Sequence, residues 1–329
     1  MKVIIDAMGS DRSPSVEVEG AVQAVEEFGC ELVLVGDEAS IKNELSKYGS
    51  HADKISIIHT PERIEMHEPA AISVRRKRHS SIVVGLDMLK KNEADAFVSA
   101  GNTGAVVCAA MLSLRLLPGV ERPGIAIGIP TLKGSSMVID VGANIDPKPI
   151  HLLQYGIMAD AYCKYILHKP DPKVGLLNVG EEESKGTAFI KESHTLLSES
   201  KLNFIGNIEG RGIYSGIADI VLCDGFVGNV ILKVSESVAD TIIKLLRREI
   251  RANIIATLGA ALASSAFNEL KKKMDYSEQG GAPLLGVDGR CIICHGSSTA
   301  KAIKNAIRVA AEFKTQDLNV RIIEELESY

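Results

Sequence analysis

One short segment concentrates side chains that could do chemistry: Asn178-Val-Gly-Glu-Glu-Glu-Ser-Lys-Gly186. It follows an apolar run at 173–177 that is typical of a buried strand, and a helical pattern begins after it at Thr187. In an open α/β sheet, ligands bind beyond the carboxyl ends of the strands. A turn needs glycine or a helix cap, but it does not need consecutive acids beside a lysine. We therefore interpret the segment as part of a working site, and a solvated charged turn is the alternative. The candidate catalytic residues in it are Asn178, Glu181, Glu183 and Lys185.

The order of residues in this segment argues against a P-loop. That motif needs Gly-Lys-Ser/Thr, so that backbone amides and the lysine meet the phosphates together. Here Lys185 precedes Gly186, and carboxylates stand where phosphate would approach. We expect no nucleoside triphosphate site in this loop.

Glycine and small polar residues also follow other apolar runs. If the runs are parallel strands, the turns share one edge of the sheet and together form a polar, backbone-rich cleft. The candidate cleft residues are Asp6, Gly9, Asp140, Asn144, Asn207, Glu209, Asp224 and Gly225, and Asn229 and His295 join the catalytic candidates.

The turn at 99–104 has a clear physical use because it opens a helix. Free amides at a helix start attract an anion, and glycine allows the anion to approach closely. The candidate phosphate-binding residues are Ser99, Gly101, Asn102, Thr103 and Gly104. An ordinary strand-to-helix turn is the alternative, and neither a GxGxxG fingerprint nor a G-K-[ST] motif occurs in the chain.

Short apolar runs alternate with longer helical patterns along the whole chain. This alternation predicts an α/β fold with a mainly parallel sheet covered by helices on both faces. We see no repeat and no low-complexity linker, so the sequence marks no lobe boundary, and one large domain over 1–329 or two lobes remain open. The expected strands are 3–6, 32–35, 55–58, 96–98, 125–129, 137–140, 174–177, 204–205, 220–223 and 291–294. The expected helices are one capped by Ser13 and others at 41–47, 81–90, 103–116, 149–167, 187–197, 240–275 and 299–313.

Composition restricts the function classes. The net charge of −5, the 4% aromatic content and the absence of tryptophan argue against a nucleic-acid binder. The six cysteines are scattered, and Cys291 and Cys294 lie three apart in a strand pattern, so their sulfurs should point to opposite faces. Reduced buried thiols are therefore expected, which favours a cytoplasmic location, and a zinc site is not expected. The first residues enter a strand pattern at once, so no signal peptide is expected.

The helical pattern at 240–275 has an uncharged middle, 252–268, between basic flanks. It is too short and too often interrupted by polar residues to span a bilayer. We expect a protruding helical hairpin whose tip enters the headgroup region, with its cations near anionic lipid. A core or dimer-interface helix pair is the alternative, and both readings hold if hairpins pair across a dimer. The expected membrane contacts are Ile254, Ile255, Leu258 and Leu262.

A second basic cluster precedes the helical pattern at 81–90. A solvated surface turn is one interpretation, and a docking patch for an acidic protein is the other. The cluster consists of Arg75, Arg76, Lys77 and Arg78.

Taken together and in order, these motifs resemble one family across nearly the whole chain, the bacterial acyl-acyl carrier protein:phosphate acyltransferases of phospholipid synthesis. The resemblance implies transfer of a long acyl chain from the carrier-protein thioester to inorganic phosphate, giving acyl phosphate. It implies α/β/α layers like those of phosphotransacetylases and isocitrate-type dehydrogenases. It also implies a homodimer associated peripherally with the inner face of the cell membrane, with acidic acyl carrier protein as partner and no metal or organic cofactor. The matching segments are IDAMGSD (5–11), SAGNTGA (99–105), RPGIA (122–126), DVGAN (140–144), LLNVGEEESKG (176–186), GNIEG (206–210), CDGFVGNV (223–230), GGAPLLGV (280–287) and HGSS (295–298).

Under this resemblance the enzyme must position two anionic reactants and stabilise a thioester oxyanion. We expect the 99–104 turn and Lys185 to hold phosphate, with Glu181 and Glu183 orienting the lysine. Asn178, Asn229 or His295 would donate to the oxyanion.

Two other functions compete with this reading. One is a dehydrogenase on a similar fold, using NAD and a divalent metal at Asp140, Asp224 or Glu183. The other is a membrane-associated scaffold that presents carrier protein without catalysis.

Overall fold

The computed structural model describes residues 1–49, 54–274 and 280–329, with only the backbone described at 271, 273 and 274. Within these residues the strands form one 11-stranded sheet in the order β3-β2-β1-β4-β11-β10-β5-β6-β9-β7-β8. The strands are β1 (Lys2–Asp6), β2 (Glu31–Gly36), β3 (Ile55–His59), β4 (Ala96–Ser99), β5 (Gly124–Thr131), β6 (Gly134–Ile139), β7 (Val174–Leu177), β8 (Phe204–Ile208), β9 (Ile220–Leu222), β10 (Ala282–Leu285) and β11 (Cys291–Ile293).

The sheet consists of two parallel groups that run in opposite directions. β1 to β4 and β11 are parallel to one another, and so are β6, β9, β7 and β8. Between the groups, β10 is antiparallel to both β11 and β5, and β5 is antiparallel to β6. The carboxyl ends of the two groups therefore lie at opposite edges. The expectation that all glycine-rich turns share one edge is wrong for this reason.

Helices cover both faces of the sheet, so the expected three-layer α/β/α class is confirmed. Alternate residues of β1 show the division, because Val3 and Ile5 enter one hydrophobic core while Ile4 enters the other. α1, α6 and α12 pack in the first core, and α4 and α5 pack in the second. The helices are α1 (Ser15–Phe28), α2 (Glu38–Leu45), α3 (Ala70–Arg76), α4 (Ser81–Lys90), α5 (Thr103–Ser113), α6 (Pro149–Tyr165), α7 (Ala188–Ser198), α8 (Gly210–Ser215), α9 (Gly225–Arg251), α10 (Ile254–Leu262), α11 (Ser264–Met274), α12 (Ala300–Thr315) and α13 (Leu318–Glu327).

The same alternation separates the two cysteines of the CxxC segment. Cys294 belongs to the first core and Cys291 to the second, so their thiols point to opposite faces as expected. All six cysteines lie in the described part of the chain, and each has a free thiol.

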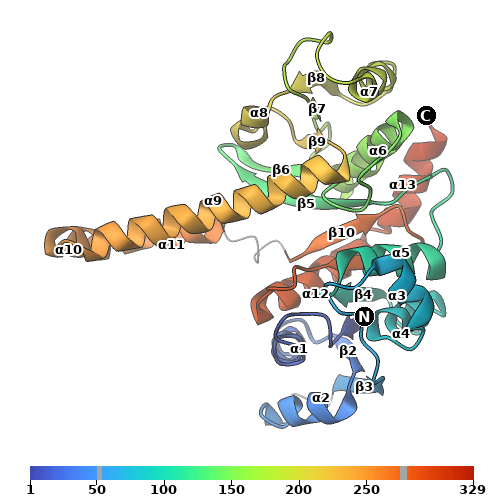
Figure 1. Cartoon of the computed structure of the whole chain (residues 1–329), viewed down its shortest axis with the longest axis vertical. Coiled ribbons are helices and arrows are strands. Elements are labelled where there is room, and N and C mark those ends of the chain that lie inside the picture. Colours follow the sequence, from blue (N-terminus) through green and yellow to red (C-terminus); the bar gives the residue numbers. More distant parts are fainter. Residues whose placement is uncertain (50–53, 275–279) are drawn as a thin grey trace.

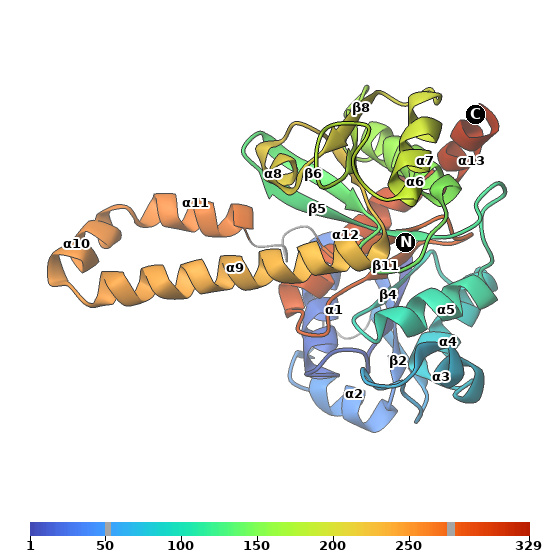
Figure 2. The same ribbon diagram turned by 45° about the horizontal axis from the view of Figure 1, so that its top comes forward.

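A long arm leaves the body of the molecule. Figures 1 and 2 show α9 projecting sideways, with α10 at its far end and α11 running back beside it. The apolar side chains of α10 are open to solvent, with exposures of 81% at Ile254, 80% at Ile255, 64% at Leu258 and 89% at Leu262. The reading of this segment as a core helix pair is therefore wrong. No helix in the described ranges is both long and apolar enough to cross a bilayer.

Some elements differ from the sequence-based expectation. β10, α3, α8 and α13 were not expected, and α9 begins at Gly225 rather than near residue 240. Residue 275, the expected last residue of the hairpin, lies outside the described residues. Helix α1 has Pro14 at its N-cap without a side-chain cap, so the expected cap by Ser13 is wrong.

Candidate functional site

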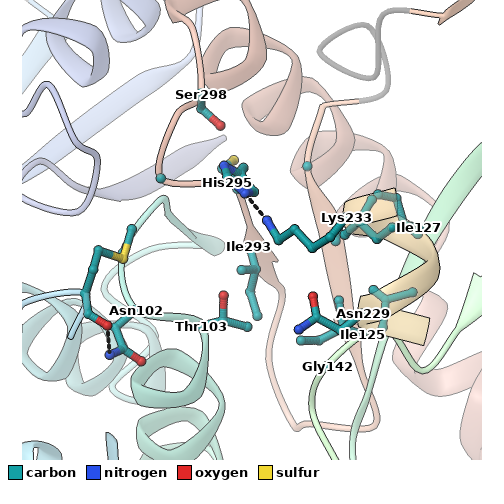
Figure 3. Close-up of a pocket in the computed structure, with 18 of the residues that line it drawn as sticks. Asn102, Thr103, Ile125, Ile127, Gly142, Asn229, Lys233, Ile293, His295 and Ser298 are labelled. Atoms are coloured by element: carbon teal, nitrogen blue, oxygen red, sulfur yellow. Dashed lines mark hydrogen bonds between the residues drawn. The ribbon is translucent and has the colours of Figure 1, made fainter. Parts of the chain in front are cut away.

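A cavity of about 480 Å³ lies over the centre of the sheet, between the start of α5 and the first turns of α9. Its floor is one face of the central strands, formed by Ile125, Ile127, Ala282 and Ile293. Figure 3 shows Thr103 and Asn229 facing each other across this space, with His295 and Lys233 at one end. The turn after β4 and the start of α9 after β9 belong to the two oppositely directed strand groups. They meet here over one face of the sheet, not along a shared row of strand ends.

The first wall is the start of α5. Asn102 caps the helix, since its Oδ1 accepts from the Ala105 amide at 3.0 Å. The Nδ2 group of Asn102 donates to the carbonyl groups of Glu65, Met66 and Glu68, which ties the preceding loop to the wall. The amides of Thr103 and Gly104, which line the cavity, have no acceptor within the helix. This wall can therefore bind an anion.

Buried groups behind this wall hold the turn in place. Ser99 Oγ donates to Asp6 Oδ2 at 2.7 Å and accepts from the Gly101 amide at 3.0 Å. A Cβ on Gly9 would lie 2.6 Å from the Gly101 nitrogen, so only glycine fits there. Burial raises the pKa of Asp6, although hydrogen bonds from Ser81 and Ser99 oppose the shift. Asp6, Gly9 and Ser99 therefore position the turn and do not face a ligand.

The second wall is the start of α9, and Asp140 anchors it. The buried carboxylate of Asp140 accepts from the amides of Ile125, Gly142, Ala143 and Asn144 at 2.7 to 3.0 Å. Burial raises the pKa of Asp140, while these amide hydrogen bonds act in the opposite direction.

The helix itself sits directly on this anchored loop. Asp224 caps α9 through the Val227 amide at 2.9 Å, and the Gly225 amide donates to the Asn144 carbonyl at 2.8 Å. A Cβ on Gly228 would lie 1.9 Å from the Asp140 carbonyl oxygen. This close packing fixes the direction in which Asn229 and Lys233 point.

A cation and an imidazole meet at one end of the cavity. The Lys233 ammonium group contacts Nε2 of His295, and it also lies 3.7 Å from a carboxylate oxygen of Glu236. On the other side of the ring, Nδ1 accepts from the Ser297 amide at 3.1 Å. Burial, followed by the charge of Lys233, lowers the pKa of His295. Together with the α5 amides, these groups can bind an anion next to the apolar floor.

The cavity contains part of the residue set expected from sequence. Six of the candidates line it: Gly101, Asn102, Thr103, Gly104, Asn229 and His295. A second group supports the walls from behind, as described above: Asp6, Gly9, Ser99, Asp140, Asn144, Asp224 and Gly225.

Four other candidates lie at a second hollow of about 680 Å³ beside β8 and α8. Glu181, Glu183, Asn207 and Glu209 line this hollow, and Asn207 Nδ2 donates to the Glu182 carbonyl at 3.2 Å. Lys185 is exposed on the same loop, where its carbonyl accepts from Asn178 Nδ2 at 3.3 Å. The two lining sets share no residue, so the structure does not bring this loop into the first cavity.

Lys233 and Glu236 were missed from the sequence, although both line the first cavity. A signal was present, because Asn229 and Lys233 are four residues apart and share a face of any helix through them. Reading the helical pattern as starting near 240 hid this relation.

The metal site of the dehydrogenase alternative does not form. Asp140 is fully engaged by amides, Asp224 caps α9, and Glu183 is at the other hollow. In the ranges that the structure describes, no group of three or more His, Cys, Asp or Glu residues is placed to hold a metal ion.

The basic cluster lies at the end of α3 and just beyond it. Arg75, Arg76 and Arg78 are exposed, while Lys77 pairs with Glu68 and donates to the Arg63 carbonyl at 2.9 Å. The Glu68 carbonyl accepts from Asn102, so the cluster is connected to the first wall of the cavity.

Comparison with known proteins places the chain in a family. Residues 1–321 match the family model described as a fatty acid synthesis protein. A phosphate acyltransferase from Geotalea uraniireducens (strain Rf4) is 49% identical over 327 residues, covering 99% of this chain and 94% of that protein. One from Geobacter sulfurreducens (strain ATCC 51573 / DSM 12127 / PCA) is 47% identical over 328 residues, covering 100% and 95%.

Solved structures with the same fold include two phosphotransacetylases. The enzyme from Streptococcus pyogenes superposes with a TM-score of 0.64 at 18% identity, covering 96% of this chain and 94% of its own. EutD phosphotransacetylase from Staphylococcus aureus gives 0.60 at 15% identity, covering 100% and 94%. At such identities the likeness shows the fold alone, whereas the full-length relatives and the family model show kinship. The chain therefore belongs to the bacterial phosphate acyltransferase family and is an acyltransferase that uses phosphate.

Proposed function

We propose that the chain transfers a long-chain acyl group from the thioester of acyl carrier protein to inorganic phosphate, giving acyl phosphate for phospholipid synthesis. The observation that carries this proposal is the division of the first cavity. Helix-start amides, Lys233 and His295 offer an anion site, and Ile125, Ile127 and Ile293 offer an apolar surface beside it. The two reactants need these two surfaces, since one is a dianion and the other has an aliphatic chain next to its carbonyl.

The protein has to position the two reactants and does not need to form a covalent intermediate with either of them. A phosphate oxygen attacks the thioester carbonyl carbon, a tetrahedral oxyanion forms, and the C–S bond breaks with its electron pair leaving on sulfur. The thiol has an unperturbed pKa of ~8.5, so the thiolate leaves with little acid assistance. Phosphate would bind the amides of Thr103 and Gly104, with Asn229 or His295 donating to the oxyanion.

Lys185 keeps a role in this proposal only as a prediction. Lys185 is exposed on the 178–186 loop and does not line the first cavity, whereas Lys233 is the lysine that lines it among the described residues. Loss of activity in Lys185→Ala would require that its loop reach the cavity during turnover.

For the carrier protein we propose docking on Arg75, Arg76 and Arg78. These exposed cations lie next to the cavity wall that Asn102 forms, and an acidic protein would be attracted to them. Replacing Arg75 and Arg76 with alanine should raise KM for the carrier substrate and leave kcat unchanged. An unaltered KM would exclude this surface.

We further propose that the enzyme is a cytoplasmic homodimer held at the inner face of the membrane. The apolar tip of α10 next to Arg247, Arg248 and Arg251 favours contact with anionic lipid. An exposed apolar row on α9 favours pairing with a second copy, and it consists of Phe226, Val230, Val234, Val238 and Ile242.

The decisive experiment incubates the purified chain with palmitoyl carrier protein and inorganic phosphate. We expect free carrier-protein thiol to appear in equal amount with acyl phosphate, the latter trapped by hydroxylamine, and both to require phosphate. Thiol release without phosphate would indicate a thioesterase instead. Carrier binding without any release would favour the scaffold alternative.

A further inference from the structure

The contacts of His295 with Lys233 and Ser297 indicate the protonation state of the imidazole ring. We propose that His295 acts as a neutral hydrogen-bond donor through Nε2–H, and that it forms with Lys233 a two-donor clamp for one oxygen of inorganic phosphate. This inference rests on the proposed function and assigns protonation states and roles within that site. The alternative role for such a histidine is general base, which needs a free lone pair on Nε2.

The tautomer follows from the contact on the far side of the ring. The Ser297 amide donates to Nδ1 at 3.1 Å, and an amide can only donate. Nδ1 therefore carries no proton, and the Ser297 hydroxyl, 2.7 Å from the same nitrogen, must donate as well. In a neutral ring the remaining proton lies on Nε2.

The group facing Nε2 is also a donor. The Lys233 ammonium has three donor hydrogens and no acceptor, so Nε2–H and Lys233 present hydrogens toward the same place. Two converging donors are satisfied together when an anionic oxygen accepts from both. The cavity provides room for this anion, with the amides of Thr103 and Gly104 also lining it.

Burial, assisted by the charge of Lys233, keeps the ring neutral. Lys233 acts against the imidazolium form, whereas Glu236 on the same helix and Asp11 after β1 favour that form. Burial opposes the imidazolium as well, and the net effect is a lowered pKa for His295. At neutral pH the ring thus donates a hydrogen bond without giving up its proton.

A neutral donor suits the reaction. An imidazolium would protonate the bound dianion and weaken it as a nucleophile, whereas a neutral imidazole adds no further proton to it. The attacking oxygen forms the bond to the carbonyl carbon, and the C–S bond breaks with the electron pair on sulfur. His295 keeps its proton throughout, and the thiolate later takes a proton from solvent.

The first test is nuclear magnetic resonance on the full chain with 15N-labelled histidine. The sequence has eight histidines, and comparison with His295→Gln identifies the signals of His295. At pH 7.5 we expect the Nε2–H tautomer, with the Nε2 signal shifting as phosphate is added. In Lys233→Ala, at least tenfold more phosphate should be needed to produce the same shift of the Nε2 signal. The matched control is Lys244→Ala, an exposed lysine on the same helix that pairs with Asp240; it should behave as wild type.

The second test is kinetic. Gln can place an N–H near the position of Nε2–H but cannot act as a base, so His295→Gln should keep activity within about tenfold. His295→Ala removes one of the two donors to phosphate and puts none in its place, so it should lose roughly 10- to 10²-fold, as expected for a lost hydrogen bond to a charged group. An Nδ1–H tautomer, an imidazolium at pH 7.5, or equal losses in the two variants would each overturn the clamp. If the wild-type chain transferred no acyl group, the proposed function would fail, but the resonance experiment would still decide whether the clamp binds phosphate.

Discussion

Helix α1 carries a buried carboxyl group with only part of its hydrogen-bonding capacity used. Glu17 on α1 is fully buried, and its Oε1 accepts from the Ser10 amide at 2.9 Å. Its other oxygen, Oε2, has no hydrogen-bond partner among the residues that the structure describes. Burial raises the pKa of Glu17 from 4.5 to about 7, with a smaller contribution from Asp6. The folded chain therefore binds this proton more tightly than the unfolded chain does.

This difference predicts how stability depends on pH. Because the folded pKa is the higher one, the stabilisation is present below pH 4.5 and is lost as the pH rises through 7. The group's share of the unfolding free energy should fall by about 3 kcal/mol over that range. Glu17→Gln stays neutral and keeps an acceptor for Ser10, so it should remove this slope in urea titrations at pH 5 and pH 8. Glu19→Gln, an exposed neighbour on the same helix, should retain it, and an unchanged slope in Glu17→Gln would show that Glu17 is ionised when folded.

For individual residues, the sequence located the polar turns correctly but gave the wrong role to their carboxylates. Asp6, Asp140 and Asp224 were expected to face a ligand, and each instead accepts hydrogen bonds from its own turn. A strand-end aspartate has the same sequence signature in either role, because both roles need an acceptor beside free amides. Lys185 looked catalytic because of its dense charged surroundings, whereas Lys233 stands in an ordinary helical pattern.

At the scale of elements, α9 connects the site to the rest of the arm. Its first turn rests on the Asp140 loop, and Gly225 and Gly228 make that close approach possible. Its second and third turns carry Asn229 and Lys233 into the cavity, and its last turn carries Arg248 and Arg251 toward the tip. One rigid element thus sets the position of the cation in the anion site.

Gly228→Ala should therefore disturb both stability and the site. The new Cβ would lie 1.9 Å from a backbone oxygen, so α9 or the Asp140 loop must move. We expect a loss of about 3 kcal/mol or more in unfolding free energy, although alanine is the better helix former. Gly259→Ala in α10 is the control, because a Cβ there meets nothing within 4 Å, and it should be neutral or stabilising by up to ~1 kcal/mol. Equal effects from the two substitutions would contradict the packing argument.

The tip helix α10 should supply most of the apolar contact with lipid. We expect Leu258→Glu combined with Leu262→Glu to weaken binding to anionic vesicles at least tenfold in a flotation assay, since two buried leucines contribute about 3 kcal/mol or more. Leu132→Glu is the matched control, because Leu132 in the β5–β6 turn is 90% exposed and far along the chain from the tip. Wild-type flotation of the double variant would refute the membrane contact.

For the whole molecule, the layered class was predictable but the reversal of half the sheet was not. Alternating strand and helix patterns predict parallel pairing, and most neighbouring pairs are indeed parallel. A tight hairpin joins β5 to β6, with Thr131 opposite Gly134, and it turns every later strand of that group around. The Leu132-Lys133-Gly134 turn carries a weak sequence signal, and this one local turn determines which edge the distant 178–186 loop occupies.

Exposed apolar side chains on α9 favour association of the chain with another molecule. Apolar side chains recur every fourth residue along this helix and remain 46 to 62% exposed in the single chain. They follow one i, i+4 ridge of the helix from the body into the arm, and a lone molecule would leave this ridge in water. The members of the row are Phe226, Val230, Val234, Val238 and Ile242.

We expect a second copy of the chain to cover this row, with two arms lying side by side. Val234→Glu combined with Val238→Glu would place charges in the middle of such an interface. In sedimentation velocity the wild-type chain should migrate at twice its 35.2 kDa mass, and the double variant at that mass. Lys244→Glu also adds a carboxylate to α9 but lies off the row, so it should leave the dimer intact. If the double variant still sedimented as a dimer, the row would have to face something other than its own copy, and lipid would become the favoured occupant.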